Sequence, residues 1–522
     1  MNSVIANYFH KVTDIPAPPD KTISMFLFGI VTLFIFWNVG IFKHIHDKPN
    51  SIHTWAQCDR ASVAACYYNE SMNFLKPRVY NRGNGTSTGI CGMEFPLINY
   101  SAALCYKFFG FHEFYYRLIN FILLFAGLLS AFLMADLFLR DVLFSAIVVW
   151  LFMLSPILVF YSANFLPDSG SLGLVLISWY FFFSIGTHAD SRRRLMLFFI
   201  FITVACLIKL TSMVSLITMI ILIAGKRIRF LKTPFIPGYN REILTGFVVC
   251  FVLVFGWYRY AAWLNDTYQN YFFILKGNAV QTFQEFIQVL TSIYVFQYKD
   301  YYPFLIKIMI LVCFVVFVIT NYFQNRLLAF TFCLQLMGFA GFAMTMLRQF
   351  QDHDYYIIPM LPLIFFLFLT TAEIFIRILN AHKILHSISI ILLLVLVNVS
   401  MVVCKKSYQN DRYAEEPHQI SYSNYDKYIQ VSPYLDTLNV GKNDLVLSYH
   451  DGTPNVSLYL MNRKGSTIAE GDFDRLKSLI STNNFKYLIL NDTANFTGEM
   501  YESLQDKKIG NKYNVQIYQL KK

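Results

Sequence analysis

Charged residues are scarce in this chain. Asp, Glu, Lys and Arg together make up 14% of its 522 residues, whereas a soluble globular protein is about a quarter charged. So little charge cannot cover the surface of a soluble protein of this length, which excludes the soluble classes of enzyme and binding protein. The hydrophobic share of 56% instead indicates an integral membrane protein.

Motifs that carry common chemistry are also missing. The chain has no Walker motif or other glycine-rich phosphate loop, no G-x-S-x-G motif and no paired CxxC. It has no internal repeat and no low-complexity segment. Four of its nine cysteines cluster in or beside the first long loop: Cys58, Cys66, Cys91 and Cys105. They are either free thiols in packed helices or include one disulfide formed in an oxidising compartment, and their spacing fits no zinc signature.

Long apolar runs fill the first 404 residues, which we predict to form a transmembrane domain. A helix needs roughly 20 apolar residues to cross the bilayer core. About eleven spans are predicted, near residues 23–42, 118–139, 142–160, 169–187, 195–208, 212–225, 243–263, 305–320, 328–347, 357–376 and 385–404. The run 195–224 is too long for one helix and short for two. A lysine at mid-bilayer is costly, so we place Lys209 at the apex of a short helical hairpin.

Basic residues in the short loops predict the orientation. Cytoplasmic loops carry an excess of Lys and Arg. The set expected there is Arg140, Arg192–Arg194, Lys226–Arg229, Lys232, Arg241, Arg326, Arg377 and Lys383. The N-terminus is then cytoplasmic, and the loops 43–117 and 264–304 and the tail are external. The net charge of +11 therefore reflects topology and not a nucleic-acid partner, and the short loops favour a bacterial inner membrane.

The long first external loop, 43–117, is itself basic and exceeds the loop length that the charge rule governs best. Its charges are therefore available for an anionic ligand. The tail, 405–522, has shorter apolar runs and more turn signals. Strands are predicted at 444–449, 486–490 and 513–518, with helices at 454–461 and 472–480. This alternation predicts a small external α/β domain.

Two acids on the external side are candidates for chemistry. Asp59 follows the first span and could act as a base at the membrane boundary, or could pair with Arg60 or cap a helix. Asp168 follows Pro167 at the start of a predicted helix, where it could serve only as a cap or could also face a site.

A polar and aromatic cluster lies at 348–356, before Pro359. His353 stands between two aspartates and could bind a metal, but one histidine with neighbouring acids is a weak signal. The segment could also line a polar cavity or form a solvated turn. Four basic residues on the same side suit a phosphate or diphosphate at headgroup level: Lys209, Arg348, Arg78 and Arg82.

The side on which chemistry occurs limits the donor. The predicted cytoplasmic face has only short basic loops, so a reaction would take place outside, where nucleotide-activated donors are absent. A lipid-linked donor is the natural alternative, because its polyprenyl tail can lie in the bilayer beside the site.

These features together resemble the GT-C glycosyltransferases. The likeness is closest to family 39, the protein O-mannosyltransferases and bacterial aminoarabinose transferases, and covers nearly the whole chain in layout. It is carried by Asp59 in a long first external loop with amphipathic helices, the segment Glu94-Phe95-Pro96-Leu97, Pro167-Asp168, Lys209 in a short hairpin, His353-Asp354-Tyr355-Tyr356 before a span, and the external α/β domain.

The resemblance implies roles residue by residue. Asp59 matches the family's catalytic base or its activator, Asp168 a second acid near the acceptor, and Lys209 a lysine near the donor phosphate. Glu94 stands where the family often has a lysine, in Lys-Pro-Pro-Leu, and Arg60 stands where the family often has the glutamate of Asp-Glu. Glu94 implies a different contact between this loop and the phosphate, and Arg60 implies a different donor sugar.

The implied reaction moves a sugar from a polyprenyl phosphate or diphosphate to a hydroxyl of a glycan, lipid or protein. A carboxylate takes the acceptor proton, and cations stabilise the departing phosphate. Arg348 joins Lys209 in that role, with Arg78 and Arg82 as lesser candidates. The cavity is expected to be lined by Glu94, His353, Asp354 and Tyr356. No cofactor is expected, and a divalent cation stays an open alternative that no residue pattern indicates.

Two alternatives remain. A transporter or flippase for a lipid-linked or anionic substrate would place ionisable residues near the midplane, between repeats. A non-catalytic membrane scaffold would have no cavity joining Asp59, Asp168 and Lys209.

Overall fold

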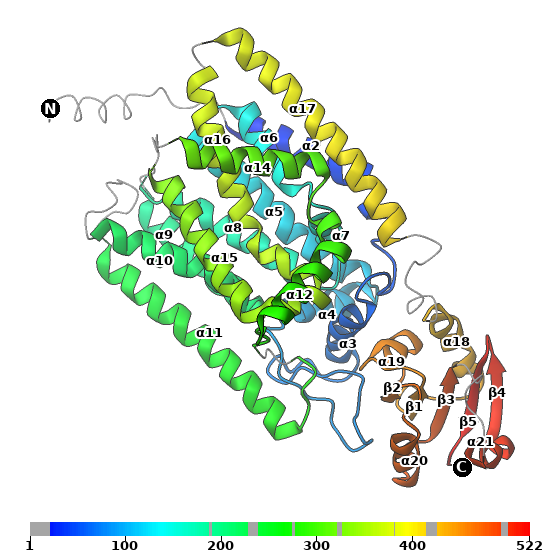
Figure 1. The fold of residues 1–522 in the computed structure, drawn as a ribbon. Helices are drawn as coiled ribbons and strands as arrows, with labels where there is room; N and C mark the ends of the chain where they lie inside the picture. Colours follow the sequence, from blue (N-terminus) through cyan, green and yellow to red (C-terminus); the bar gives the residue numbers. More distant parts are fainter. Residues whose placement is uncertain are drawn as a thin grey trace.

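The computed structural model describes residues 21–186, 190–227, 239–273, 277–320, 326–379, 382–413, 425–491 and 499–521. Most of the chain forms a bundle of helices, and the C-terminal part forms a small domain with a β-sheet at one end of that bundle (Figure 1). This arrangement confirms the predicted polytopic helical fold with a small α/β domain.

A helix occupies each of the eleven predicted spans. These helices are α2 (Lys21–Val39), α5 (Phe114–Leu139), α6 (Val142–Met153) with α7 (Pro156–Ser162), α8 (Asp168–Ser184), α9 (Ser191–Ile208), α10 (Met213–Arg227), α11 (Asn240–Tyr268), α14 (Phe304–Ile319), α15 (Arg326–Asp352), α16 (Leu361–Leu379) and α17 (Lys383–Lys406). Within the described ranges, six helical segments are long and apolar enough to cross a membrane alone, or seven if the bent pair α6–α7 counts as one. The rest are shorter.

Two segments differ from the sequence-based expectation. The span predicted at 142–160 is bent by 85° between α6 and α7. Pro156 starts the second helix, because proline cannot continue the first one, and Ser155 caps it by accepting from the Leu158 N–H at 3.4 Å. The loop expected at 264–304 contains an amphipathic helix, α12 (Phe283–Phe296), which Thr282 caps.

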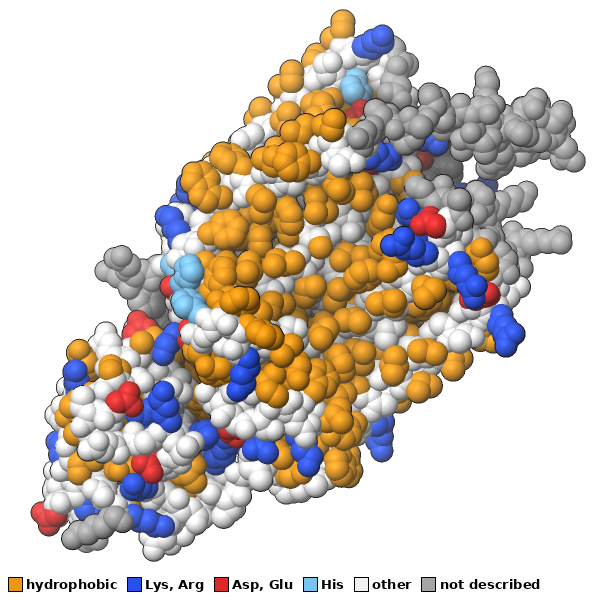
Figure 2. Space-filling view, turned by 180° about the vertical axis from the view of Figure 1, so that it is seen from behind, with side chains coloured by type: hydrophobic (Ala, Val, Ile, Leu, Met, Phe, Trp, Pro, Cys, Tyr) orange, Lys and Arg blue, Asp and Glu red, His pale blue; other side chains and the backbone are white. Residues whose placement is uncertain are grey.

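The outer surface of the bundle is apolar. Figure 2 shows a broad belt of hydrophobic side chains between the charged C-terminal domain and a group of charged residues at the opposite edge. Side chains on four helices are more than 60% exposed, including Phe26, Phe255, Phe304 and Leu392. Soluble proteins rarely expose apolar patches of this size. The chain is therefore a multi-pass membrane protein.

Ion pairs and hydrogen bonds join the helix ends that carry the basic loops. Lys21 lies 2.6 Å from Asp136, and His386 lies 2.8 Å from Asp141. Arg194 donates to the Ser184 hydroxyl at 2.8 Å. The starts of α2, α6, α9 and α17 thus lie on one side of the bundle together with the ends of α5 and α8. We call it the basic side, and the C-terminal domain lies at the other side (Figure 1).

The C-terminal domain contains a five-stranded sheet in the order β2-β1-β3-β5-β4. Its strands are β1 (Leu445–Tyr449), β2 (Lys464–Ile468), β3 (Tyr487–Asn491), β4 (Lys508–Lys512) and β5 (Val515–Gln519), and its helices are α18 (Asp426–Thr437), α19 (Val456–Met461), α20 (Phe473–Ser481) and α21 (Glu499–Leu504). The three predicted strands correspond to β1, β3 and β5. Strands β2 and β4 were not predicted, because Lys464–Gly465–Ser466 and Lys508–Lys512 lack an apolar run.

The first external loop joins this domain to the bundle. Its helices are α3 (Thr54–Asn69) and α4 (Leu97–Phe109). Between them, Asn81 forms a parallel bridge with Gly465 of the edge strand β2. The Arg82 N–H donates to the Gly465 carbonyl at 2.6 Å, and the Gly465 N–H donates to the Tyr80 carbonyl at 3.2 Å. The loop therefore pairs with the outer edge of the sheet at this one bridge.

All nine cysteines are free thiols. The four cysteines in or beside the first external loop are thus free thiols and form no disulfide, and most of them are buried among packed side chains. The stability of the loop therefore depends on packing and hydrogen bonds rather than on a covalent link.

A buried ionic network holds the loop, the bundle and the start of the tail together. Arg412 has a side chain only 1% exposed and lies 3.1 Å from Asp300 and 2.7 Å from Asp354. The second oxygen of Asp354 accepts from the Tyr161 hydroxyl at 2.6 Å and lies 3.2 Å from His53 Nε2. Five segments meet here: α3, α7, α13 (Tyr298–Tyr301), η3 (Asp354–Met360) and η4 (Ser407–Arg412).

Replacing Arg412 with Met should destabilise the protein by about 3–5 kcal/mol, because two buried carboxylates lose their cation. The measurement is the free energy of unfolding in mild detergent. The control is Arg377→Met, which removes an arginine that is 48% exposed and 2.8 Å from Glu373 and should cost no more than about 1 kcal/mol. Equal effects of the two substitutions would contradict this account.

Candidate active site

Lys209 lies at a break between two helices. Helix α9 ends at Ile208, the backbone of Lys209 is extended, and η2 (Leu210–Ser212) leads into α10. The Lys209 N–H donates to the Ala205 carbonyl at 2.8 Å and the Ser212 N–H donates to the Lys209 carbonyl at 3.0 Å. The predicted break at Lys209 is therefore present, but α9 packs against α8 and α11 whereas α10 packs against α15, so the two helices do not form a closely packed hairpin.

Asp168 and Lys209 form a buried ion pair. The lysine Nζ lies 2.9 Å from one carboxylate oxygen and 3.1 Å from the other. Asp168 is fully buried and the Lys209 side chain is 12% exposed. The ammonium also lies 5.3 Å from the ring centre of Tyr355 and 5.5 Å from that of Tyr356, within range of cation–π attraction. Asp168 is the first residue of α8, so the helix dipole also favours its negative charge.

A second ion pair flanks the first. Two nitrogens of Arg60 lie 2.9 and 2.8 Å from Glu94 Oε1. Burial opposes the charge of Arg60, but Glu94, Tyr355 and Asp168 together raise the pKa of its guanidinium. The Phe95 N–H donates to the Leu207 carbonyl at 3.0 Å, which fixes this loop segment against the end of α9. The two ion pairs therefore belong to one cluster.

Asp59 is buried beside this cluster but points toward the C-terminal domain. It accepts a hydrogen bond from the Asn455 side chain at 2.8 Å, where Asn455 precedes α19. Consecutive residues of a helix point in different directions, so Arg60 faces Glu94 while Asp59 faces Asn455. Burial raises the pKa of Asp59 to about 7, with smaller contributions from Asp451 and Glu94, against the opposing effects of the Asn455 hydrogen bond and Arg60.

The other predicted basic residues have separate partners. Arg78 lies 3.2 Å from Glu70, and Arg82 pairs with the same carboxylate. Lys464 of β2 also lies 3.2 Å from Glu70. The side chains of Arg78 and Arg82 therefore brace the external loop internally through Glu70, while Lys464 and the backbone of Arg82 join that loop to the C-terminal domain. The structure does not bring them to Lys209.

Arg348 pairs with Glu285 of α12 and keeps 38% of its side chain exposed. It follows Met346 by two residues at the end of α15. Its guanidinium is therefore committed to a carboxylate that is itself partly exposed.

Residues of the segment before α16 contact two different clusters. Tyr356 faces Lys209, whereas Asp354 belongs to the Arg412 network. His353 lies among aromatic rings, with centroids 5.5 Å from Trp55 and 5.7 Å from Tyr356. Among the described residues, no group of three His, Cys, Asp or Glu side chains is placed to hold a metal ion.

The sequence did not predict the roles of three residues that form these contacts. Arg60 was noted as a possible partner of Asp59 and as a departure from the family pattern, but it pairs with Glu94 instead. Tyr355 was quoted only as part of a segment, and a tyrosine pair beside a predicted buried lysine was the available signal. Asn455 carried no signal, because its contact with Asp59 joins residues 396 positions apart.

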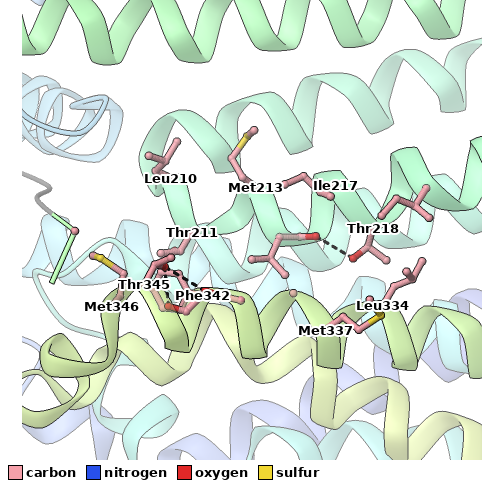
Figure 3. Close-up of a pocket in the computed structure, with 15 residues that line it drawn as sticks. Leu210, Thr211, Met213, Ile217, Thr218, Leu334, Met337, Phe342, Thr345 and Met346 are labelled. Carbon is pink, nitrogen blue, oxygen red and sulfur yellow. Dashed lines mark hydrogen bonds between the residues drawn. The ribbon is translucent and has the colours of Figure 1, made fainter. Parts of the chain in front are cut away.

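An apolar groove of about 660 Å³ lies between α10 and α15 (Figure 3). One end is formed by Leu210 and Thr211, next to Lys209, together with Thr345 and Met346. The Thr211 hydroxyl is buried and has no hydrogen-bond partner among the described residues. Farther along the groove, Gln335 donates to Thr218 at 2.9 Å. The groove thus runs from the candidate site into the apolar part of the bundle.

The pair Asp168 and Lys209 should behave as one unit in a double-mutant cycle. Lys209→Met leaves a buried carboxylate unpaired and should cost about 3–5 kcal/mol of unfolding free energy. Adding Asp168→Asn removes that charge and should recover a large part of the loss, which makes the two effects non-additive. Additive effects in detergent unfolding measurements would show that the two groups do not interact.

Comparison with known proteins gives a structural likeness without a sequence match. No protein-family model and no curated protein sequence matches the chain. The structure is similar to ArnT from Cupriavidus metallidurans in the apo state, with a TM-score of 0.57 and 12% identity over 96% of this chain and 99% of that one. It is also similar to ArnT bound to undecaprenyl phosphate, with a TM-score of 0.58 and 10% identity over 94% of this chain and 98% of that one.

A third similar structure is the arabinofuranosyltransferase AftD from Mycobacteria, with a TM-score of 0.51 and 10% identity over 97% of this chain and 40% of that one. At such identities the likeness concerns the fold. It agrees with the resemblance drawn from the sequence: this chain has the fold of the GT-C membrane glycosyltransferases.

Proposed function

We propose that this chain is a membrane glycosyltransferase, which moves a sugar from a polyprenyl phosphate or diphosphate to an acceptor hydroxyl. The observation that carries the proposal is a buried lysine–carboxylate pair, Lys209 and Asp168, next to one end of a lipid-facing apolar groove. The acceptor is a glycan, lipid or protein.

The groove suits a polyprenyl tail. Its walls are largely apolar, and a chain lying in it would have its phosphate at Leu210 and Thr211, beside Lys209. The unpartnered Thr211 hydroxyl could then donate to a phosphate oxygen, and the Lys209 ammonium would stabilise the charge on the leaving group. A similar fold has been seen with undecaprenyl phosphate bound, in ArnT.

Among the acids of the site, Asp59 is the best candidate for the general base. Asp168 and Glu94 each form an ion pair with a cation, so their carboxylate oxygens are already engaged by Lys209 and Arg60. The hydrogen bond that Asp59 accepts comes from a neutral amide, and burial raises its pKa to about 7, near the value that favours proton transfer at neutral pH.

In the proposed step the acceptor oxygen forms a bond to the anomeric carbon while its proton passes to Asp59. The bond between that carbon and the phosphate oxygen breaks, and its electron pair leaves with the phosphate beside Lys209. Tyr356, whose ring centre lies 5.5 Å from the Lys209 ammonium, would line the site there, and Arg348 would contact the donor only after leaving Glu285.

We place the C-terminal domain outside the cytoplasm and the N-terminus inside, in a bacterial inner membrane. The basic side would then face the cytoplasm, as cytoplasmic loops favour Lys and Arg. The position of the ion pairs supports a transferase over a carrier. Asp168 starts α8 and Lys209 follows α9, so the charges lie at helix ends and not at a midplane between repeats.

Asp59→Asn should lower sugar transfer by about 100-fold or more, because the acceptor proton loses its base. The full chain is assayed in membranes for transfer of radiolabelled sugar from the endogenous lipid-linked pool. For the unmodified protein, kcat/KM should fall below about pH 7, where Asp59 becomes protonated. Undiminished transfer by the variant would remove Asp59 from the mechanism.

A stability measurement separates loss of a base from loss of folding. The pKa of Asp59 is raised in the folded state, so its contribution is favourable at low pH and is lost as the pH rises through about 7. Asp59→Asn keeps an acceptor for Asn455 and never ionises. Its unfolding temperature should therefore exceed that of the unmodified protein more at pH 8 than at pH 5.

Filling the groove should weaken binding of the donor tail. Gly341 lines the groove, and a Cβ added there meets no atom within 4 Å, so Gly341→Leu should fold normally. Its affinity for undecaprenyl phosphate should fall about tenfold in native mass spectrometry. Gly256→Leu is the matched control, since Gly256 is equally open but lies on α11, outside this groove.

A further inference from the structure

A second apolar groove, of about 790 Å³, follows the seam between α9 and α11. The α9 residues that line one wall of it recur every three or four positions, so they share one face of the helix. That wall consists of Arg192, Leu195, Met196, Phe199, Ile200, Thr203, Val204 and Leu207. From first to last it spans roughly 22 Å at 1.5 Å per residue. The groove therefore crosses much of the apolar belt.

The two ends of this groove differ in charge. Leu207 and Phe95 form the end near the candidate active site, whereas Arg192, Arg241 and Glu242 form the end at the basic side. Within the described ranges, neither arginine has a hydrogen bond or an ion pair. Each lies in the first turn of its helix, where the helix dipole also favours an anion.

The walls of the groove are open to lipid. Met196 and Ile200 are 59% and 52% exposed, and Leu253 on the facing helix is 50% exposed. The floor is closed by the close approach of Phe199 to Gly246, where a Cβ would lie 2.3 Å from the ring. An extended hydrocarbon chain fits such a surface, and two guanidinium groups at its end suit a phosphate.

From this charge and shape we infer that the groove between α9 and α11 is a binding site for an anionic phospholipid of the leaflet at the basic side. The phosphate lies at Arg192 and Arg241, and one acyl chain lies along the groove. Basic pockets between membrane helices on that side are suited to anionic headgroups. Glu242 opposes the anion from the same end and limits the affinity. The site is separate from the groove at Lys209, and the inference does not depend on the proposed reaction.

The test uses the full chain in a neutral detergent, titrated with phosphatidylglycerol or phosphatidylcholine and observed by native mass spectrometry. The first phosphatidylglycerol should bind at least tenfold more tightly than phosphatidylcholine. Arg192→Gln with Arg241→Gln should weaken that binding roughly 10- to 30-fold, at about fivefold for each arginine. Glu242→Gln should strengthen it.

Two further variants distinguish the site from general charge effects. Arg193→Gln removes a neighbouring exposed arginine that does not line the groove and should leave binding within twofold. Val249→Trp keeps both arginines but fills the groove at a lipid-facing position that is 48% exposed, and should weaken phosphatidylglycerol binding. If a variant is not monodisperse in gel filtration, the single arginine substitutions replace the double one.

The inference is overturned if the unmodified chain does not prefer phosphatidylglycerol, or if Arg193→Gln costs as much as the groove substitutions. Binding that is lost with the arginines but kept in Val249→Trp would mean a headgroup contact without a chain in the groove, and would also overturn it. Free glycerol 3-phosphate is included as a competitor, and effective competition would point to a soluble anion instead of a lipid.

Discussion

The ion pair between Asp168 and Lys209 constrains the centre of this structure. Both groups are removed from water, and an isolated buried charge costs several kcal/mol. The start of α8 and the end of α9 therefore have to meet, and α9 has to stop where its lysine can reach the carboxylate. The same break separates α9 from α10 and gives each of them its own lipid-facing groove.

The short segment η3 connects this pair with the Arg412 network. Tyr355 faces Lys209, while the preceding residue, Asp354, faces Arg412 and His53. Two adjacent residues thus anchor two charged clusters, one at the candidate site and one at the junction of loop, bundle and tail. A shift of η3 in either direction would separate a buried charge from its partner, so the segment fixes the distance between the two clusters.

Hydrophobic runs predicted the positions of the eleven helices, because burial in lipid requires apolar helices with internally paired backbones, although only six or seven of the described segments are long and apolar enough to span. The position of Lys209 was predictable for the same reason, since its charge excludes a continuous span. The partners of individual side chains were harder to predict from the sequence. Arg78 and Arg82 read as phosphate ligands until Glu70 is known to be near, and the direction of Asp59 depends on Asn455 across the domain boundary. Such contacts between distant segments leave no periodic signal.

The bridge between Tyr80–Arg82 and Gly465 covers part of an edge of the C-terminal sheet. Within the described sheet, β2 pairs with β1 on one side and with this loop segment on the other. A tail fragment produced without the bundle would present the outer backbone groups of β2 unpaired, and an open edge of this kind invites pairing with other chains. Protection of this edge thus comes from a piece of chain that precedes β2 by more than 300 residues.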